Sequence, residues 1–139
     1  MPKKLLPTQP HKSSQKLPRN KITPEEFGSY MVKNLCRNVG LATLAKEMGI
    51  SLSKFKRVFY DTYNTTPHRW LLTNRTIIAL IILINSNRSV TQIANECGFG
   101  TPSLFIRHFR GLFGTSPMRY RQYILYARKK SAEQWERED

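Results

Sequence analysis

The sequence predicts an all-α protein of seven helices, arranged as two helix-turn-helix units joined by a long helix. Three observations lead to this prediction: apolar residues recur at helical spacing, capping residues precede the apolar stretches, and one stretch occurs twice. No window alternates with a period of two, so we predict no strands. A length of 139 residues suits one domain or two small lobes, each with a modest core.

Each predicted helix has a recognisable start. Thr23, Pro24 and Glu26 form the pattern of a capping box with proline at the first helical position. The opening residues are, in order, Thr23, Gly40, Ser51, Thr66, Ser89, Thr101 and Ser116. The expected helices cover about 24–38, 41–48, 51–63, 67–85, 90–97 and 101–113, and a seventh begins at 117. Asn64 and Gly114 suit the left-handed conformation that ends a helix.

These elements predict five segments. They are a disordered basic arm (1–22), a first unit (23–66), a linker helix (67–86), a second unit (87–128) and a charged tail (129–139). Residues 1–20 contain four prolines, five Lys or Arg and no acid, too little apolar surface to offset the entropy of ordering. The sequence leaves open whether this arm adds phosphate contacts or is only a tail.

The chain is strongly basic. It carries a formal charge of +14, and residues 1–132 hold 22 basic side chains against 5 acidic ones. A field of this size favours a polyanion, either nucleic acid or an anionic membrane surface, over a merely soluble basic surface. The only cysteines are Cys36 and Cys97, and no signal peptide precedes the first helix. We therefore expect two small core residues in a reducing, cytoplasmic setting.

The repeated stretch explains the architecture. Residues 51–70 align with 101–120 at an offset of 50, and upstream the offset is 49. Identical pairs in the aligned stretch are Ser53/Ser103, Phe55/Phe105, Arg57/Arg107, Phe59/Phe109, Thr65/Thr115, Pro67/Pro117 and Arg69/Arg119. Each copy is a short helix, a turn with glycine, and a longer helix with Phe at i and i+4, as in a helix-turn-helix. The alternative is a generic helical repeat, but solenoids need about three or more units.

The ordered motifs resemble the DNA-binding domain of the AraC/XylS transcription regulators over roughly residues 24–125. The specific part is the second half, where A-x-x-x-G-F, F-x-R-x-F and G-x-S-P-x-x-Y-R all occur. The matching residues are Ala94, Gly98, Phe99, Phe105, Arg107, Phe109, Gly114, Ser116, Pro117, Tyr120 and Arg121. The resemblance implies that the second helix of each unit, its recognition helix, enters a DNA major groove.

The resemblance also implies which side chains contact DNA. Base contacts fall on Ser53, Lys56, Arg57, Ser103, Leu104, Ile106 and Arg107. Arg57 and Arg107 are the strongest candidates, because a guanidinium matches guanine O6 and N7. Phosphate contacts are expected at Lys54, Arg69, Thr91, Gln92, Arg119 and Arg121. Leu104 and Ile106 either pack on thymine methyl groups or signal weaker readout by the second unit, and we favour the latter.

The length of the linker helix suits two adjacent grooves. Nineteen residues from Pro67 to Asn85 span about 28 Å, and successive major grooves lie about 34 Å apart. One chain would thus act as a dimer does, on a site that need not be palindromic. The partner expected from this reasoning is double-stranded DNA.

The linker helix is also unusually apolar. Residues 77–84 are all apolar, far short of the roughly 20 residues of a membrane span. Ile77, Leu80, Ile81 and Ile84 fall on the face opposite Arg75 and Ile78. We expect this face to meet a second copy, RNA polymerase or another regulator, unless the first helix or the C-terminal tail covers it.

We expect no enzyme activity, cofactor or metal site. His11, His68 and His108 are scattered, and the two cysteines have no zinc spacing. The rival functions are a non-specific nucleic-acid-binding protein and a regulator that acts through protein contacts. The resemblance implies a separate ligand-sensing domain in full-length members, for which this sequence has no room. The chain is therefore expected to be either a small stand-alone regulator or a fragment.

Overall fold

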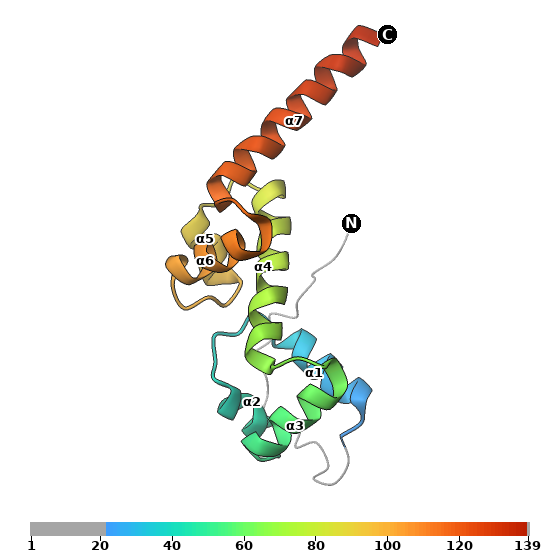
Figure 1. The fold of residues 1–139 in the computed structure, drawn as a ribbon, viewed down its shortest axis with the longest axis vertical. Helices are drawn as coiled ribbons and strands as arrows, with labels where there is room; N and C mark the ends of the chain where they lie inside the picture. Colours follow the sequence, from blue (N-terminus) through green and yellow to red (C-terminus); the bar gives the residue numbers. More distant parts are fainter. Residues whose placement is uncertain (1–21, 139) are drawn as a thin grey trace.

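The computed structural model describes residues 22–138, and within them it contains seven α-helices and no strand. The helices are α1 (Pro24–Lys33), α2 (Leu41–Glu47), α3 (Leu52–Tyr63), α4 (Pro67–Asn85), α5 (Val90–Glu96), α6 (Pro102–Phe113) and α7 (Pro117–Glu138). Figure 1 shows α1, α2 and α3 as a first lobe, and α5, α6 and the start of α7 as a second lobe. The long α4 runs between the lobes. The predicted all-α architecture is confirmed.

The first lobe closes around aromatic rings. Phe27 of α1 and Phe55 and Phe59 of α3 are fully buried, and the Phe27 and Phe55 ring centroids lie 5.5 Å apart. Trp70 of α4 meets Phe59 edge-on at 5.5 Å. Because Phe55 and Phe59 lie one turn apart, they turn one face of α3 inward and leave the opposite face outside.

The second lobe repeats this arrangement around α6. Phe105 and Phe109 are fully buried, and Phe99 lies 5.1 Å from Phe105. Tyr120 of α7 contacts Phe109 edge-on at 5.6 Å. The tandem phenylalanines therefore anchor each recognition helix to its own core.

The linker helix α4 belongs to both cores. Leu71 packs in the first core, whereas Leu72, Ala79 and Leu83 pack in the second. Ile78 contacts both. A single rigid helix thus fixes the spacing of the two lobes.

Two arginines tie backbone segments to this scaffold. Arg75 of α4 is buried, and it donates from Nε to the carbonyl of Leu35 (2.6 Å) and from Nη2 to that of Arg37 (2.7 Å). Burial lowers the pKa of this guanidinium. Arg121 of α7 donates in the same way to the carbonyls of Leu83 (2.9 Å) and Arg88 (2.6 Å).

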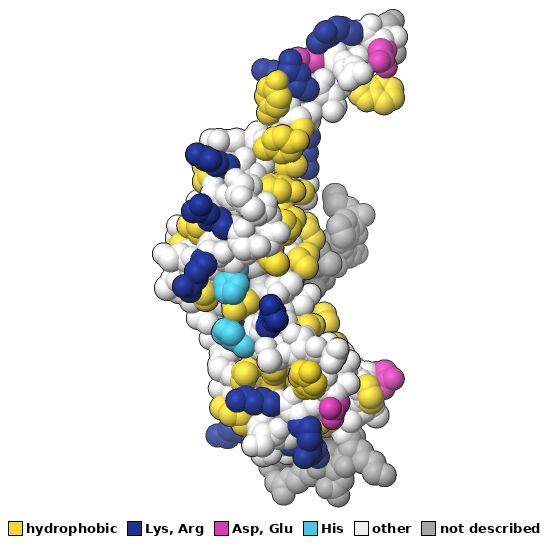
Figure 2. Space-filling view, viewed as in Figure 1, with side chains coloured by type: hydrophobic (Ala, Val, Ile, Leu, Met, Phe, Trp, Pro, Cys, Tyr) yellow, Lys and Arg dark blue, Asp and Glu magenta, His cyan; other side chains and the backbone are white. Residues whose placement is uncertain are grey.

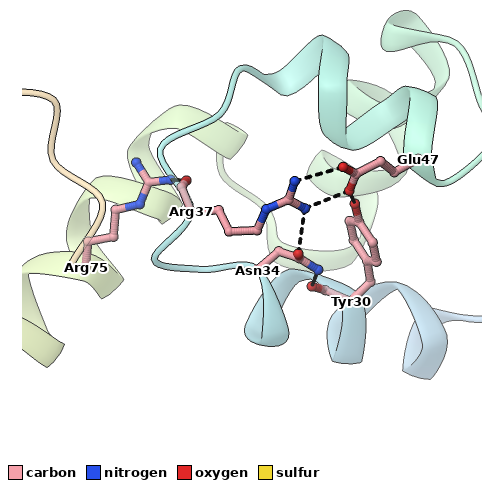
Figure 3. Close-up of polar contacts among 5 residues, drawn as sticks. All are labelled: Tyr30, Asn34, Arg37, Glu47 and Arg75. Carbon is pink, nitrogen blue, oxygen red and sulfur yellow. Dashed lines mark hydrogen bonds and ion pairs between the residues drawn. The ribbon is translucent and has the colours of Figure 1, made fainter. Parts of the chain in front are cut away.

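The first helix is shorter than expected, because it ends at Lys33 and not near Asn38. The Asn34 side chain donates to the carbonyl of Tyr30, which the Asn34 amide also uses. Beyond it, Arg37 forms a two-pronged ion pair with Glu47 at 2.8 and 2.9 Å, and the Tyr30 hydroxyl donates to the same carboxylate (Figure 3). These contacts and Arg75 hold residues 34–40 as a connecting segment.

The last helix is longer than expected. Residues 129–138, expected as a charged tail, continue α7 without a break and carry it away from the second lobe (Figure 1). Arg128 Nη1 donates to the carbonyl of Ile84 at 2.5 Å, which ties α7 to the end of α4. The predicted basic arm lies outside the described residues, except for Ile22.

The lobes also touch at Cys36 and Cys97. Gly98 has φ +86°, and a Cβ at this position would lie 2.5 Å from the carbonyl oxygen of Cys36. The Cys97 thiol hydrogen bonds to Cys36 and lowers the Cys36 pKa to about 7, against the effect of burial. Both cysteines are free thiols, and this junction packs the turn of the second lobe directly on the first.

Candidate nucleic-acid interface

The recognition helix of the first lobe, α3, presents an exposed polar face. Its cap, Ser51, accepts a hydrogen bond from the Lys54 amide (3.1 Å). With Phe55 and Phe59 buried, the side chains on the outer face are exposed. They are Ser53, Lys54, Lys56 and Arg57. This face offers hydroxyl, ammonium and guanidinium donors, the groups that bind base edges and phosphates.

The recognition helix of the second lobe, α6, presents fewer such groups. Ser103 and Arg107 are exposed, but Leu104 and Ile106 are half-buried. Leu104 packs against the second core. Part of the Leu104 side chain is therefore buried inside the lobe and cannot contact DNA. This favours the interpretation that the second unit reads fewer bases.

The residues expected at phosphates fall into two groups. Lys54, Arg69, Thr91, Gln92 and Arg119 are all exposed. Gln92 also uses its Oε1 to accept from the Ser89 amide (3.0 Å), and α5 has only seven residues. Arg121 is different, because its guanidinium donates to the Leu83 and Arg88 carbonyls. We therefore assign Arg121 to holding α7 against α4 and remove it from the phosphate contacts.

The surface charge follows the two lobes. Figure 2 shows Lys and Arg side chains over both lobes of the viewed face, with few acidic side chains among them. Two of the five acids before residue 133 are engaged in ion pairs, Glu47 with Arg37 and Glu96 with Arg88. The helix α6 contains no acid at all. On each recognition helix, basic side chains thus outnumber acidic ones.

The structure brings together two histidines that are scattered in the sequence. His68 opens α4 and His108 lies on α6, forty positions away, yet Figure 2 shows the histidine side chains side by side between the lobes. Burial lowers the pKa of His108, and the nearby charges of Arg107 and His68 lower it further. No short-range sequence signal relates residues on different helices at this separation.

The apolar face of α4 is only partly exposed. Ile77 and Ile81 are 44% and 55% exposed, respectively. Leu80 and Ile84 are half-buried, and Leu80 packs against the second core. The expected four-residue apolar face is thus reduced to two isoleucines one turn apart.

Two further features bear on function. Within residues 22–138, no three His, Cys, Asp or Glu side chains lie close enough together to hold a metal ion. None of the helices described has the length and apolarity needed to cross a membrane.

Comparison with known proteins identifies the family. A family model described as a helix-turn-helix domain matches residues 44–123. A structure of a transcriptional regulator from Chromobacterium violaceum, described as having an AraC-type DNA-binding domain, has a TM-score of 0.61 and 26% identity. It covers 72% of this chain and 89% of that one. The chain belongs to the AraC-type helix-turn-helix family. The expected resemblance is confirmed.

Two longer proteins are similar to part of this chain. The transcriptional regulator ExsA of Pseudomonas aeruginosa is 34% identical over 98 residues, which are 70% of this chain and 35% of that protein. LcrF, a thermoregulatory protein of Yersinia pestis, is 33% identical over 99 residues, 70% of this chain and 36% of that protein. The chain thus spans about a third of the length of these relatives.

A domain solved together with DNA is similar in structure as well. The DNA-binding domain of the global transcriptional factor AdpA, crystallised with a target DNA, has a TM-score of 0.70 and 31% identity to this chain. The match covers 76% of this chain and 96% of that domain.

Proposed function

We propose that this chain is a sequence-specific, double-stranded DNA-binding transcription regulator that inserts α3 and α6 into adjacent major grooves. The observation that carries the proposal is the exposure of basic outer faces on two recognition helices that a single helix, α4, holds at a fixed spacing. The likeness to the AdpA domain, which was solved with target DNA, supports the same function.

The proposed contacts divide by chemistry. Base edges are read by Ser53, Lys56 and Arg57 in one groove and by Ser103, Ile106 and Arg107 in the other, with Leu104 contributing only its exposed part. Phosphates are bound by Lys54, Arg69, Thr91, Gln92 and Arg119, which position the protein without reading sequence. Because α6 presents fewer polar groups, the first groove should supply most of the discrimination.

Selection of bound duplexes from a random pool at a stated salt concentration tests this function. We expect a recovered motif that spans two grooves and a specificity ratio of about 10³ or more over random DNA. A footprint confined to one groove would contradict two-groove insertion. Equal affinity for random and selected DNA would favour the rival, a non-specific nucleic-acid-binding protein.

Two variants separate base contacts from phosphate contacts. Arg57→Ala should lose about 1–3 kcal/mol of discrimination at one base pair and leave the preference elsewhere intact. Arg69→Ala should weaken binding uniformly and lower the salt slope by about one. A uniform loss with Arg57→Ala would reassign Arg57 to a phosphate.

The exposed isoleucines support a narrower, second proposal. Ile77 and Ile81 lie on one face of α4 and form a contact with another protein, which we propose to be a second copy of this chain. Two side chains provide far less than the roughly 800 Å² per partner of a stable interface, so the association should be weak. Sedimentation of wild type and of the Ile77→Glu, Ile81→Glu double variant checks this. A monomeric wild type at high concentration would end the proposal.

A further inference from the structure

A hollow of about 370 Å³ lies between α4 and α6, and we call it the interlobe hollow. Arg69 and Thr73 line it from α4, and Arg107, His108, Gly111 and Leu112 line it from α6. Its polar groups are two guanidinium groups, an imidazole and a hydroxyl, and no acidic side chain lines it. This donor set matches a phosphate, and no carboxylate lines the hollow to favour a cation.

A second hollow lies beside the other recognition helix, α3. It is lined by Lys56 and Tyr60 of α3, by Leu41, and by Thr66, Pro67 and His68 at the start of α4. It too lacks an acidic side chain. His68 faces the second hollow and also lies close enough to His108 to affect its charge. Basic or hydrogen-bonding groups therefore line both hollows, and His68 and His108 lie at the point where the two hollows approach each other.

We propose that the interlobe hollow binds a backbone phosphate of the DNA segment that crosses between the two major grooves, and that His108 takes up a proton when the phosphate binds. This inference rests on the proposed function, because a duplex that enters two adjacent grooves must pass its backbone between α3 and α6. The phosphate is held by Arg69, with Thr73 donating its hydroxyl. Arg107 lines the same hollow and adds positive charge there, while its guanidinium reads a base edge.

The shape of the hollow suits a backbone more than a base. Gly111 is exposed, and a Cβ added to it would have no other heavy atom within 4 Å. No side chain stands between the backbone of α6 and solvent at Gly111, so a phosphodiester can approach α6 closely there. A carboxylate placed there would face the bound phosphate and repel it.

The charge state of His108 gives the site its pH dependence. In the free protein, burial lowers the pKa of His108, and the nearby Arg107 on α6 and His68 on α4 lower it further. Arg69 lines the same hollow from α4. A bound phosphate supplies the opposite charge and favours the imidazolium. Affinity for DNA should then rise as pH falls, by about tenfold for each unit by which binding raises the pKa.

The same histidine affects folding in the opposite direction. Its folded pKa lies below the unfolded value of about 6.5, so the unfolded chain binds more protons as pH falls. His108 therefore contributes stability to the folded protein above a pH of about 6.5. This contribution is lost as the pH falls through the lower pKa of the folded state. Acidification should weaken the fold slightly while it tightens DNA binding, a combination that general damage to the protein would not produce.

Fluorescence anisotropy of a labelled duplex between pH 5.5 and 8, at constant ionic strength, tests the inference. The probe is the duplex from the selection, or a random-sequence duplex of the same length if no motif emerges. We expect wild type to bind more tightly at low pH and His108→Gln to lose most of this dependence. His108→Lys should bind tightly at both ends of the range, because its charge is permanent. His11→Gln is the matched control, since it removes the third histidine of the chain and should leave the pH dependence in place.

The DNA side supplies an independent arm. Neutral methylphosphonate linkages midway between the two protected grooves should abolish the pH dependence, whereas linkages at the ends of the site should not. Gly111→Glu should bind more weakly at every pH, and its helix should remain intact because Glu favours helices more than Gly does.

The outcomes separate the two proposals. If His108→Gln retains the wild-type pH dependence, or His11→Gln removes it, the inference is wrong and the two-groove function stands. The inference fails in the same way if central methylphosphonates have no effect. If no duplex is bound at any pH, both proposals fail.

Discussion

The two lobes have similar aromatic cores but differ on their outer faces and at their turns. Phe55 and Phe59 in the first lobe and Phe105 and Phe109 in the second are all fully buried. At four aligned positions outside the cores, α3 presents exposed Ser53, Lys54, Lys56 and Arg57. At the same positions, α6 presents exposed Ser103 and Arg107 with half-buried Leu104 and Ile106. The aligned copies thus keep what anchors a recognition helix and vary what it displays.

The turns differ as well. Gly49 and Gly98 both have positive φ, +72° and +86°. A Cβ on Gly49 would meet nothing within 4 Å, but one on Gly98 would overlap the Cys36 carbonyl. Equivalent glycines therefore serve one purpose in the first lobe, a tight turn, and two in the second, a tight turn and the contact between lobes.

The largest expected effect tests whether the lobes are separable. Phe59→Ala and Phe109→Ala should each cost about 3–5 kcal/mol of unfolding free energy, because each removes a buried ring. Since Leu71 of α4 packs in one core and Leu72 in the other, we expect a single urea transition for both variants. A biphasic transition, with one lobe surviving the loss of the other, would contradict this coupling.

The turn glycines should give the next largest difference. Gly49→Ala should cost about 1–2 kcal/mol, the penalty of a left-handed conformation for a residue with a Cβ. Gly98→Ala should cost about 1–3 kcal/mol more, because the backbone of Cys36 must move to relieve the overlap. Thermal unfolding of the two variants side by side measures the difference. Equal losses of stability would show that the backbone at Cys36 moves away from the added Cβ at little cost.

Much of this architecture could be predicted from the sequence, because its signals are local. Thr23 with Glu26, Ser89 with Gln92, and proline after Thr66 and Thr101 predict helix starts that the structure has. The continuation of α7 was also predictable, since residues 129–138 contain only good or neutral helix formers and no Gly or Pro. The segment was expected as a charged tail, and residues 129–138 of it are helical. Charged residues at helical spacing are compatible with an exposed helix.

What the sequence could not predict depends on contacts between distant residues. The early end of α1 follows from side chains of Arg37, Glu47 and Arg75 that meet only after folding. The pairing of His68 with His108 and the burial of Leu104 are likewise properties of the packed lobes. Arg121 matches a family motif, from which we expected a phosphate contact. In the structure its guanidinium donates to the carbonyls of Leu83 and Arg88, which the sequence does not indicate.

The arginines that hold backbone carbonyls provide a third comparison. Arg75→Met should cost about 1–3 kcal/mol, because it leaves the buried Leu35 carbonyl without its donor. Arg121→Met should cost less, since Arg121 is only half-buried and water can reach the Arg88 carbonyl it leaves. Hydrogen exchange should also quicken in residues 34–40 for Arg75→Met alone. An equal loss of stability in the two variants would mean that the greater burial of Arg75 does not increase its contribution.

The smallest effect is expected at the ends of the recognition helices, where the lobes use different residues for one task. Asn64 (φ +55°) and Gly114 (φ +75°) both close their helices by donating to a carbonyl one turn back, Tyr60 at 2.8 Å and Arg110 at 2.9 Å. Because Asn tolerates this conformation and nothing lies within 4 Å of a Cβ at Gly114, Gly114→Asn should change stability by only about 0.5 kcal/mol. Gly114→Val should cost clearly more, since a β-branched side chain strains a positive φ. Urea denaturation of both variants would distinguish backbone conformation from space as the constraint, and a large loss with Asn would show that the second lobe requires glycine where the first does not.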